Sequence, residues 1–299
     1  MKKYLCMAFT VFSIVMAAQA ESNKGTADPK TPVAIVHDGI RFCESTYPYQ
    51  GGILIANFGT EQLNPLNTEG KGYIVYHKEG KNRVLIPADG NLSAPKGMFV
   101  RDEYLFVCDV NKIVVYNLQV TGSSPRIINM PEGDLFVNDL AAFGNDLYVS
   151  VTNTDKIYRI DISDLTNIGK PVEWLDIAGP NGLLIGDGTM YVASYPADGK
   201  TTDKNVIYRI ADLKKAKPEK FITIPGQYDG IAFSTDQQSL YVTNWVPVGL
   251  SKISLKTGKM IPLEFSLKEN LIGPADITVE DGFIYIPDLP NSRVIKVGE

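Results

Sequence analysis

The sequence predicts an all-β fold, a six-bladed β-propeller closed by an N-terminal strand that completes the last blade. The main observation is a short strand that recurs six times, here called the anchor strand. Its copies are ILIAN (53–57), LFVCD (105–109), LYVSV (147–151), MYVAS (190–194), LYVTN (240–244) and IYIPD (284–288). A repeat of roughly 40–50 residues built from short strands is typical of a propeller, in which each blade buries its apolar face against its neighbours.

Further strands follow each anchor strand, as a propeller blade requires. The candidate third strands are 72–78, 112–118, 156–162, 206–212, 250–256 and 293–299, and the candidate fourth strands are 83–89, 126–132, 173–179, 220–226 and 260–266. The sixth repeat ends after its third strand, and VAIVHDG (33–39) near the N-terminus supplies a fourth. Pairing it with the last blade closes the ring and leaves no open sheet edge.

The first twenty residues predict a secretory signal peptide. Lys2 and Lys3 precede an apolar run over 4–16, and Ala18-Gln19-Ala20 is a small-x-small cleavage site. The run is too short to span a membrane as a helix, so we expect no membrane insertion after cleavage. We expect a flexible polar lead-in over 21–31 and one propeller domain over 32–299, in a periplasmic or secreted protein.

The charge balance excludes two classes of partner. The chain has 29 Lys and Arg against 34 Asp and Glu, and no basic cluster stands out. We therefore expect no binding to nucleic acid or to an anionic membrane surface. Cys43 and Cys108 remain after signal cleavage, and an exported compartment permits a disulfide. Cys108 occupies the small-residue column of the anchor strand, which favours a buried free thiol.

One position ahead of each anchor strand is rich in oxygen-bearing side chains. It lies nine residues before the anchor strand, or eleven in the fifth repeat, where Asp236-Gln237-Gln238 is typical of a turn extension. The residues at this position are Glu44, Lys96, Asn138, Asn181, Asp229 and Ala275. Because the first strand of each propeller blade lines the central channel, these ring residues should surround one mouth of it.

Two carboxylates and two amides directed at one axis form a set of hard oxygen ligands. Such a set suits Ca²⁺, Mg²⁺ or Mn²⁺, and it is the open site that metal-assisted hydrolysis needs. We expect one divalent cation, with Zn²⁺ kept as a fourth possibility. The alternative explanation is turn chemistry, since Asn181-Gly182 and Asp229-Gly230 are common turn dipeptides.

The ring residues resemble motifs of the family of senescence marker protein (regucalcin), gluconolactonase and luciferin-regenerating enzyme. Glu44 lies in CES (43–45), Asn138 in FVNDL (136–140), Asn181 in GPNGL (179–183) and Asp229 in YDGIAF (228–233). Members of that family are six-bladed propellers with one divalent metal in the channel. The resemblance implies that Glu44, Asn181 and Asp229 hold the metal and that Asn138 contacts substrate. It also implies that Asp229 is the general base in lactone hydrolysis.

Two positions depart from the family's pattern. Its lactonases carry an Arg two residues before the substrate-side Asn, where this chain has Phe136. Lys96 stands at a ring position that is usually uncharged in the family. It could bind an anionic substrate, or it could weaken metal binding by repulsion.

We favour structural roles for the other polar candidates. His37 and His77 fall in outer parts of blades, where no catalytic triad can form around them. Asp139 and Asp276 follow ring positions and are expected to cap turns, with a second carboxylate shell as the alternative. The residues that end five anchor strands are also expected to cap turns: Asn57, Asp109, Ser194, Asn244 and Asp288.

Two large aromatic residues, Tyr195 and Trp245, directly follow anchor strands. We expect them to pack, with a role as pocket walls as the alternative. The sequence thus supports two hypotheses. The first is an exported metal-dependent hydrolase of the gluconolactonase type, acting on a lactone or small ester. The second is a non-catalytic propeller that binds a small ligand or a protein partner through its channel face.

Overall fold

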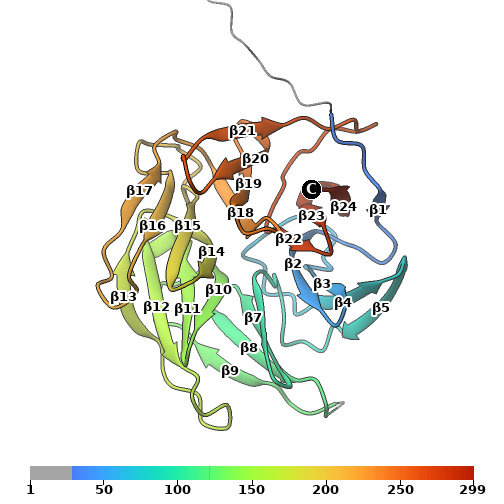
Figure 1. The fold of residues 1–299 in the computed structure, drawn as a ribbon. Helices are drawn as coiled ribbons and strands as arrows, with labels where there is room; N and C mark the ends of the chain where they lie inside the picture. The colour runs from blue at the N-terminus through green and yellow to red at the C-terminus, as the bar shows by residue number, and fades with distance from the viewer. Residues whose placement is uncertain (1–28, 121) are drawn as a thin grey trace, which may run out of the picture.

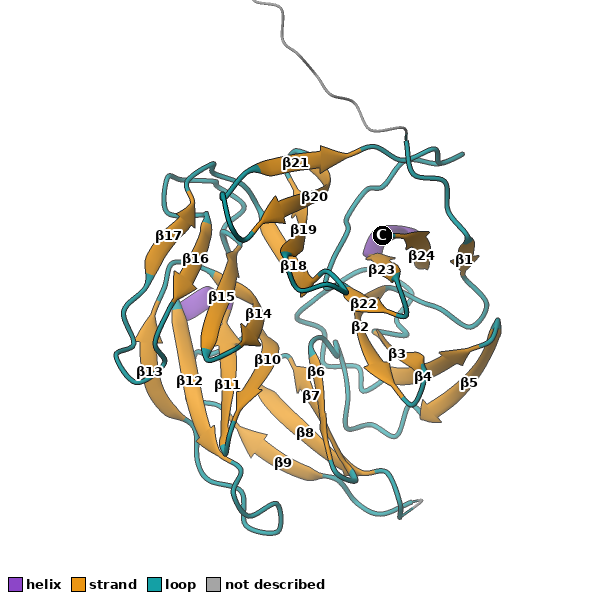
Figure 2. Ribbon diagram, viewed as in Figure 1, coloured by secondary structure: helices purple, strands orange, loops and turns teal. Residues whose placement is uncertain are grey.

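The computed structural model describes residues 29–120 and 122–299. Six four-stranded antiparallel sheets stand around a common centre like the blades of a propeller (Figure 1). The described chain is almost entirely strand and loop, with two short 3₁₀ turns at Thr152–Thr154 and Leu289–Asn291 (Figure 2). The predicted six-bladed propeller is confirmed.

Five blades follow the chain order from the centre outward. They are β2 (Cys43–Tyr49), β3 (Gly52–Asn57), β4 (Tyr73–Lys78) and β5 (Lys81–Ile86); β6 (Met98–Arg101), β7 (Tyr104–Asp109), β8 (Lys112–Asn117) and β9 (Arg126–Asn129); β10 (Val137–Phe143), β11 (Asp146–Val151), β12 (Lys156–Asp161) and β13 (Val172–Asp176); β14 (Pro180–Gly186), β15 (Thr189–Ser194), β16 (Ile207–Ile210) and β17 (Glu219–Ile222); and β18 (Tyr228–Phe233), β19 (Ser239–Trp245), β20 (Val248–Ser254) and β21 (Met260–Leu263).

The sixth blade closes the ring as the sequence predicts. It consists of β22 (Thr278–Glu280), β23 (Phe283–Asp288), β24 (Arg293–Gly298) and the N-terminal β1 (Ala34–Val36). β1 pairs antiparallel with β24, with Ile35 opposite Ile295 (Figure 1). The strand is shorter than the predicted 33–39, because the chain turns away after Val36 and leaves His37 exposed.

The predicted signal peptide and most of the predicted lead-in lie outside the described residues. At its end, the Lys30 backbone N–H donates to Glu264 O and the Lys30 carbonyl accepts from Ser266 N. Among the described residues, Lys30 is thus already tied to the segment around Phe265. Over 29–120 and 122–299, no helix is long and apolar enough to cross a membrane.

The anchor strands recur because each is packed between two neighbouring blades. Side chains alternate across a strand, so successive anchor residues face opposite blades. In β3, Ile53 packs with Tyr285 of the sixth blade, whereas Leu54 packs with Leu105 of the second. The cysteines belong to different clusters, and Cys43 and Cys108 are buried free thiols.

Candidate functional site

Five ring residues line a single cavity of about 330 Å³ at one end of the innermost strands. They are Glu44, Lys96, Asn138, Asn181 and Asp229. The sixth, Ala275, is fully buried and packs against Phe58 and Leu289, which also belong to the cavity lining. Residues spread over the chain from 44 to 229 are thus brought together around the channel.

Breaks in strand pairing mark the ring position. The register shifts between Cys43 and Ser45, between Val137 and Leu140, between Pro180 and Leu183, and between Tyr228 and Ile231. An extra residue in one strand leaves a side chain outside the regular ladder and re-aims it, as β-bulges do beside active sites. Glu44, Asn138, Asn181 and Asp229 each lie at such a break.

The turn explanation for the Asn-Gly and Asp-Gly pairs is wrong. Asn181-Gly182 lies inside β14 and Asp229-Gly230 inside β18. A Cβ on Gly182 would approach Asp229 O to 2.4 Å, and one on Gly230 would approach the Asp276 Cα to 2.5 Å. The glycines therefore let neighbouring innermost strands come together around the channel.

The ends of the anchor strands fix the loops that lead into the innermost strands. Side-chain oxygens there accept hydrogen bonds from backbone N–H groups that precede the first strand of the same blade. The pairs are Asn57 with Arg41, Asp109 with Ser93 and Ala94, Asn244 with Gln227, and Asp288 with Ile272 and Gly273. Ser194 differs, because its hydroxyl donates to Ala178 O.

Four oxygens in the cavity are buried without a hydrogen-bond partner among the described residues. They are Glu44 Oε2, Asn138 Oδ1, Asn181 Oδ1 and Asp229 Oδ1. Each of these side chains is no more than 5% exposed. Buried polar atoms are nearly always paired, and an unpaired one costs free energy, so four such oxygens from four different blades suit an electropositive partner.

Trp245 and Thr152 form hydrogen bonds with two of the ring residues, Asp229 and Asn138. The Trp245 indole N–H donates to Asp229 Oδ2 at 2.9 Å, which leaves Oδ1 free. The Asn138 amide donates to Thr152 Oγ1 at 3.3 Å, and the Thr152 hydroxyl donates to Pro180 O at 2.8 Å. These contacts hold one polar atom of Asp229 and one of Asn138 and leave Oδ1 of each unpaired.

Burial dominates the electrostatics of the ring carboxyls. It raises the pKa of Asp229 to about 7, although the Trp245 hydrogen bond and Lys96 act in the opposite direction. It also raises the pKa of Glu44, and the nearby Asp229 adds to that rise. Water-excluded carboxyls of this kind are common at functional sites.

Lys96 places a buried ammonium group in the same ring. Its Nζ donates to Ala94 O at 3.0 Å and to Pro65 O at 3.4 Å, and it lies 5.7 Å from the centre of the Phe58 ring. It forms no ion pair with an acidic side chain of the described residues. Its charge still opposes the rise in the pKa values of Glu44 and Asp229.

The cavity wall above the ring is mostly apolar. It comprises Phe58, Pro65, Phe136, Tyr195, Ala197, Gly199, Trp245 and Leu289. Tyr195 and Trp245 meet edge to face, with ring centres 6.1 Å apart. We expected these two rings to pack, with a role as pocket walls as the alternative, and both line the cavity. The hydrogen bond from Trp245 to Asp229 was not predicted. The only sequence signal was their place directly after an anchor strand.

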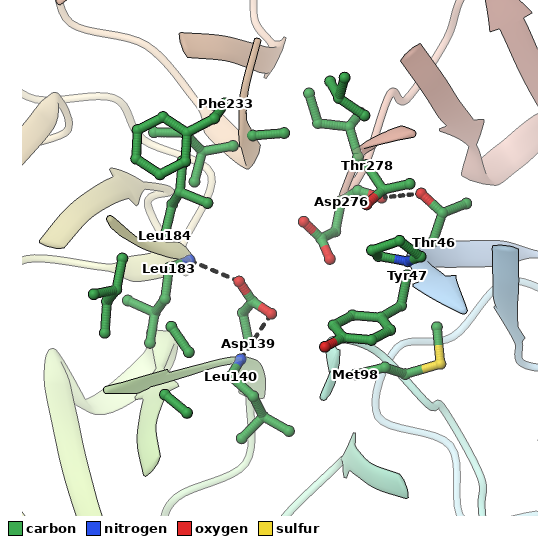
Figure 3. A pocket seen from close by; sticks show the side chains of 18 residues that line it. Thr46, Tyr47, Met98, Asp139, Leu140, Leu183, Leu184, Phe233, Asp276 and Thr278 are labelled. Carbon is green, nitrogen blue, oxygen red and sulfur yellow. Dashed lines mark hydrogen bonds between the residues drawn. The ribbon is translucent and has the colours of Figure 1, made fainter. Parts of the chain in front are cut away.

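A second cavity, of about 320 Å³, lies further along the innermost strands, away from the ring residues. Asp139 and Asp276 line it (Figure 3). The sequence predicted that both residues cap turns, and neither does. Asp139 accepts from Leu140 N and from Leu183 N of the next blade, and Asp276 accepts from Ser45 Oγ. These bonds tie neighbouring blades together.

The histidines lie away from both cavities. His77 in β4 pairs through Nδ1 with Asn82 Oδ1 at 2.6 Å, and His37 is exposed after β1. Neither belongs to the lining of the ring cavity or of the second cavity. Their structural assignment agrees with the expectation from the sequence.

The ring oxygens fit a hard divalent cation. The described residues contain no group of three or more His, Cys, Asp or Glu side chains placed to hold a metal. The ring instead offers two carboxylates and two amide oxygens, all with unpaired atoms. Oxygen ligands of this mixed kind are those that Ca²⁺, Mg²⁺ and Mn²⁺ accept.

Comparison with known proteins supports the fold. A solved structure of a protein of unknown function from Bacteroides thetaiotaomicron VPI-5482 is similar, with a TM-score of 0.58 and 12% sequence identity. The match covers 87% of this chain and 70% of that one. No protein-family model and no curated protein matches the sequence. At this identity the similarity shows a shared fold, and the function has to be inferred from the site residues.

Proposed function

We propose that this chain is an exported, metal-dependent hydrolase of the gluconolactonase type that opens a lactone or a small ester. The observation that carries the proposal is the set of four buried, unpaired oxygens contributed by four blades. The resemblance to the regucalcin and gluconolactonase family, carried by the motifs around the same residues, supports the assignment. Its partner would be a small-molecule substrate that enters at the ring cavity.

Glu44, Asn181 and Asp229 would hold the cation, and Asn138 would orient the substrate. A divalent cation in the ring would polarise the substrate carbonyl and favour ionisation of water. Asp229 would accept a proton from the attacking water and pass it to the oxygen released when the acyl C–O bond breaks. The buried ammonium of Lys96 would stabilise negative charge that develops on the substrate oxygen.

The direct test is a hydrolysis assay of metal-stripped protein on a panel of lactones and small esters. Ca²⁺, Mg²⁺, Mn²⁺ and Zn²⁺ are added back one at a time. We expect turnover that requires one of these cations and is lost in Asp229→Ala, with thermal melting used to check that the variant folds. If no substrate in the panel shows cation-dependent turnover, the proposal is contradicted.

One observation favours the alternative, a non-catalytic propeller that binds a small ligand or a protein. Lys96 already supplies a positive charge that partly compensates Glu44 and Asp229. In that case Asp229→Ala would leave ligand binding intact, and added cations would have no effect on it.

A further inference from the structure

The ring cavity combines polar side chains with a mostly apolar wall, and this combination bears on the class of substrate that it would take. The ring positions and Thr152 supply most of its polar side chains: Glu44, Lys96, Asn138, Thr152, Asn181 and Asp229. The side chains of the remaining wall offer one hydroxyl, that of Tyr195, and one indole N–H, that of Trp245, which Asp229 already accepts. A sugar ring seated against this wall would leave most of its hydroxyls without hydrogen-bond partners, which is costly on burial.

Exposed apolar side chains lie close in sequence to the wall residues. They come from the same loops that carry the wall residues: Leu63 and Leu66 lie in the loop of Pro65, Leu135 precedes Phe136, and Val246 follows Trp245. Each is between 36% and 55% exposed. An apolar group that extends from the cavity and contacts such side chains would remove them from water, which favours its binding.

We propose that the preferred substrate class is a lactone or ester with an apolar acyl or aryl substituent, rather than a sugar lactone. This inference rests on the proposed function for the position of the reacting carbonyl at the ring. The apolar substituent lies against Phe58, Phe136 and Trp245. Phe136 is the specificity-determining residue, because its apolar ring lines the cavity two residues before Asn138, the side chain proposed to orient the substrate.

The test measures binding separately from turnover. The chain has two tryptophans, Trp174 and Trp245, so Trp174→Phe leaves the cavity tryptophan as the only indole reporter. Its fluorescence is titrated, in protein loaded with a divalent cation, with two slowly reacting analogues: a γ-lactam carrying a six-carbon chain, and gluconolactam. We expect the alkyl lactam to bind at least about tenfold more tightly, since each buried methylene adds to affinity.

A matched pair of variants tests the assignment of Phe136. Phe136→Arg should remove most of the preference for the alkyl lactam. Phe143→Arg adds the same charge at an exposed position at the far end of β10, the strand that Phe136 directly precedes, outside the cavity lining, and should leave the preference unchanged. Equal or tighter binding of gluconolactam, absence of binding by both analogues, or insensitivity to Phe136→Arg would overturn the inference.

Hydrolysis of the matching lactones separates this inference from the proposed function. Binding of the alkyl lactam without turnover of its lactone under any cation supports the apolar ligand class and contradicts the hydrolase. Turnover with a preference for gluconolactone supports the hydrolase and contradicts the apolar substrate class.

Discussion

At the scale of single residues, Asp229 is held from one side only. Trp245 binds Oδ2 at 2.9 Å, and Oδ1 remains unpaired in the cavity. We predict that Trp245→Phe, which keeps an aromatic ring but removes the N–H, weakens cation binding by about 10–100-fold, as is typical when a group that orients a metal ligand is lost. Calorimetric titration of the variant with the cation measures the change.

The matched control is Trp174→Phe in β13, where the indole packs edge to face on Tyr148 at a centroid distance of 4.6 Å. It should leave the cation affinity unchanged. Equal affinities in the two variants would show that the Trp245 hydrogen bond does not position Asp229.

The raised pKa of Asp229 predicts how the stability of the cation-free protein depends on pH. Burial raises this pKa from 3.8 to about 7, so between these values the folded chain retains a proton that the unfolded chain has lost. The free energy of unfolding must then fall as pH rises through this window. Burial shifts the pKa of Glu44 in the same direction.

Thermal melting at pH 5, 6, 7 and 8 in the presence of a chelator measures this dependence. The melting temperature should fall from pH 5 to 8, and the fall should be smaller in Asp229→Ala, which lacks one of the responsible groups. A melting temperature that rises over this range would contradict the burial of ionisable ring carboxyls.

The two described cysteines give a further prediction at this scale. Cys43 and Cys108 are fully buried free thiols, and burial raises the pKa of both. Since the thiolate is the reactive form, neither should react with a thiol reagent in the native protein. A chain expressed from Glu21 should show two reactive thiols only after unfolding without reductant. If no thiol reacted after unfolding, Cys43 and Cys108 would be joined by a disulfide.

At the scale of elements, each blade uses the end of its anchor strand to hold the loop before its innermost strand. In the sixth blade an ion pair is added to this arrangement. Asp288 is fully buried, accepts from Ile272 N and Gly273 N, and pairs with Arg293 at 2.8 Å. Arg293 in turn donates to Glu269 O and Asn270 O. The pair fixes the loop that leads past Ala275 into β22.

We predict that Asp288→Ala destabilises the fold by about 3–5 kcal/mol, because Arg293 loses its buried partner and keeps only the exposed Glu269. Urea denaturation measures the loss. Asp203→Ala removes a carboxylate that is 87% exposed and lies 3.8 Å from Lys220, so it should change stability by less than about 1 kcal/mol. Similar losses in both variants would argue against a special role for the buried pair.

The elements also explain what the sequence could and could not predict. The anchor strand was recognisable because both of its faces are buried, as Ile53 and Leu54 illustrate, so its residue pattern is constrained at every position. Bulges such as that between Tyr228 and Ile231 have no signal of their own, so Asp229-Gly230 looked like a turn. The role of Trp245 depends on a contact between strands that sequence spacing does not reveal.

At the scale of the whole molecule, ring closure creates the site. β1 completes the sixth blade, and the closed ring directs innermost strands from separate parts of the chain toward one axis (Figure 1). The repeat therefore allowed the ring positions to be listed from the sequence by counting back from each anchor strand. Part of the apolar wall also lies at a repeated position, because Phe58 and Leu289 directly follow anchor strands, as Tyr195 and Trp245 do. Phe136 does not follow an anchor strand, and its place in the wall could not be predicted in this way.

The central claim is that the ring oxygens hold one divalent cation. Calorimetric titration of the metal-stripped chain with Ca²⁺, Mn²⁺, Mg²⁺ and Zn²⁺ tests it most directly. Asp276→Ala is the matched control, since it removes a carboxyl from the second cavity of the same channel. We predict one site per chain, lost in Asp229→Ala and retained in Asp276→Ala. Absence of binding by all four cations, or binding that survives Asp229→Ala, would contradict the account.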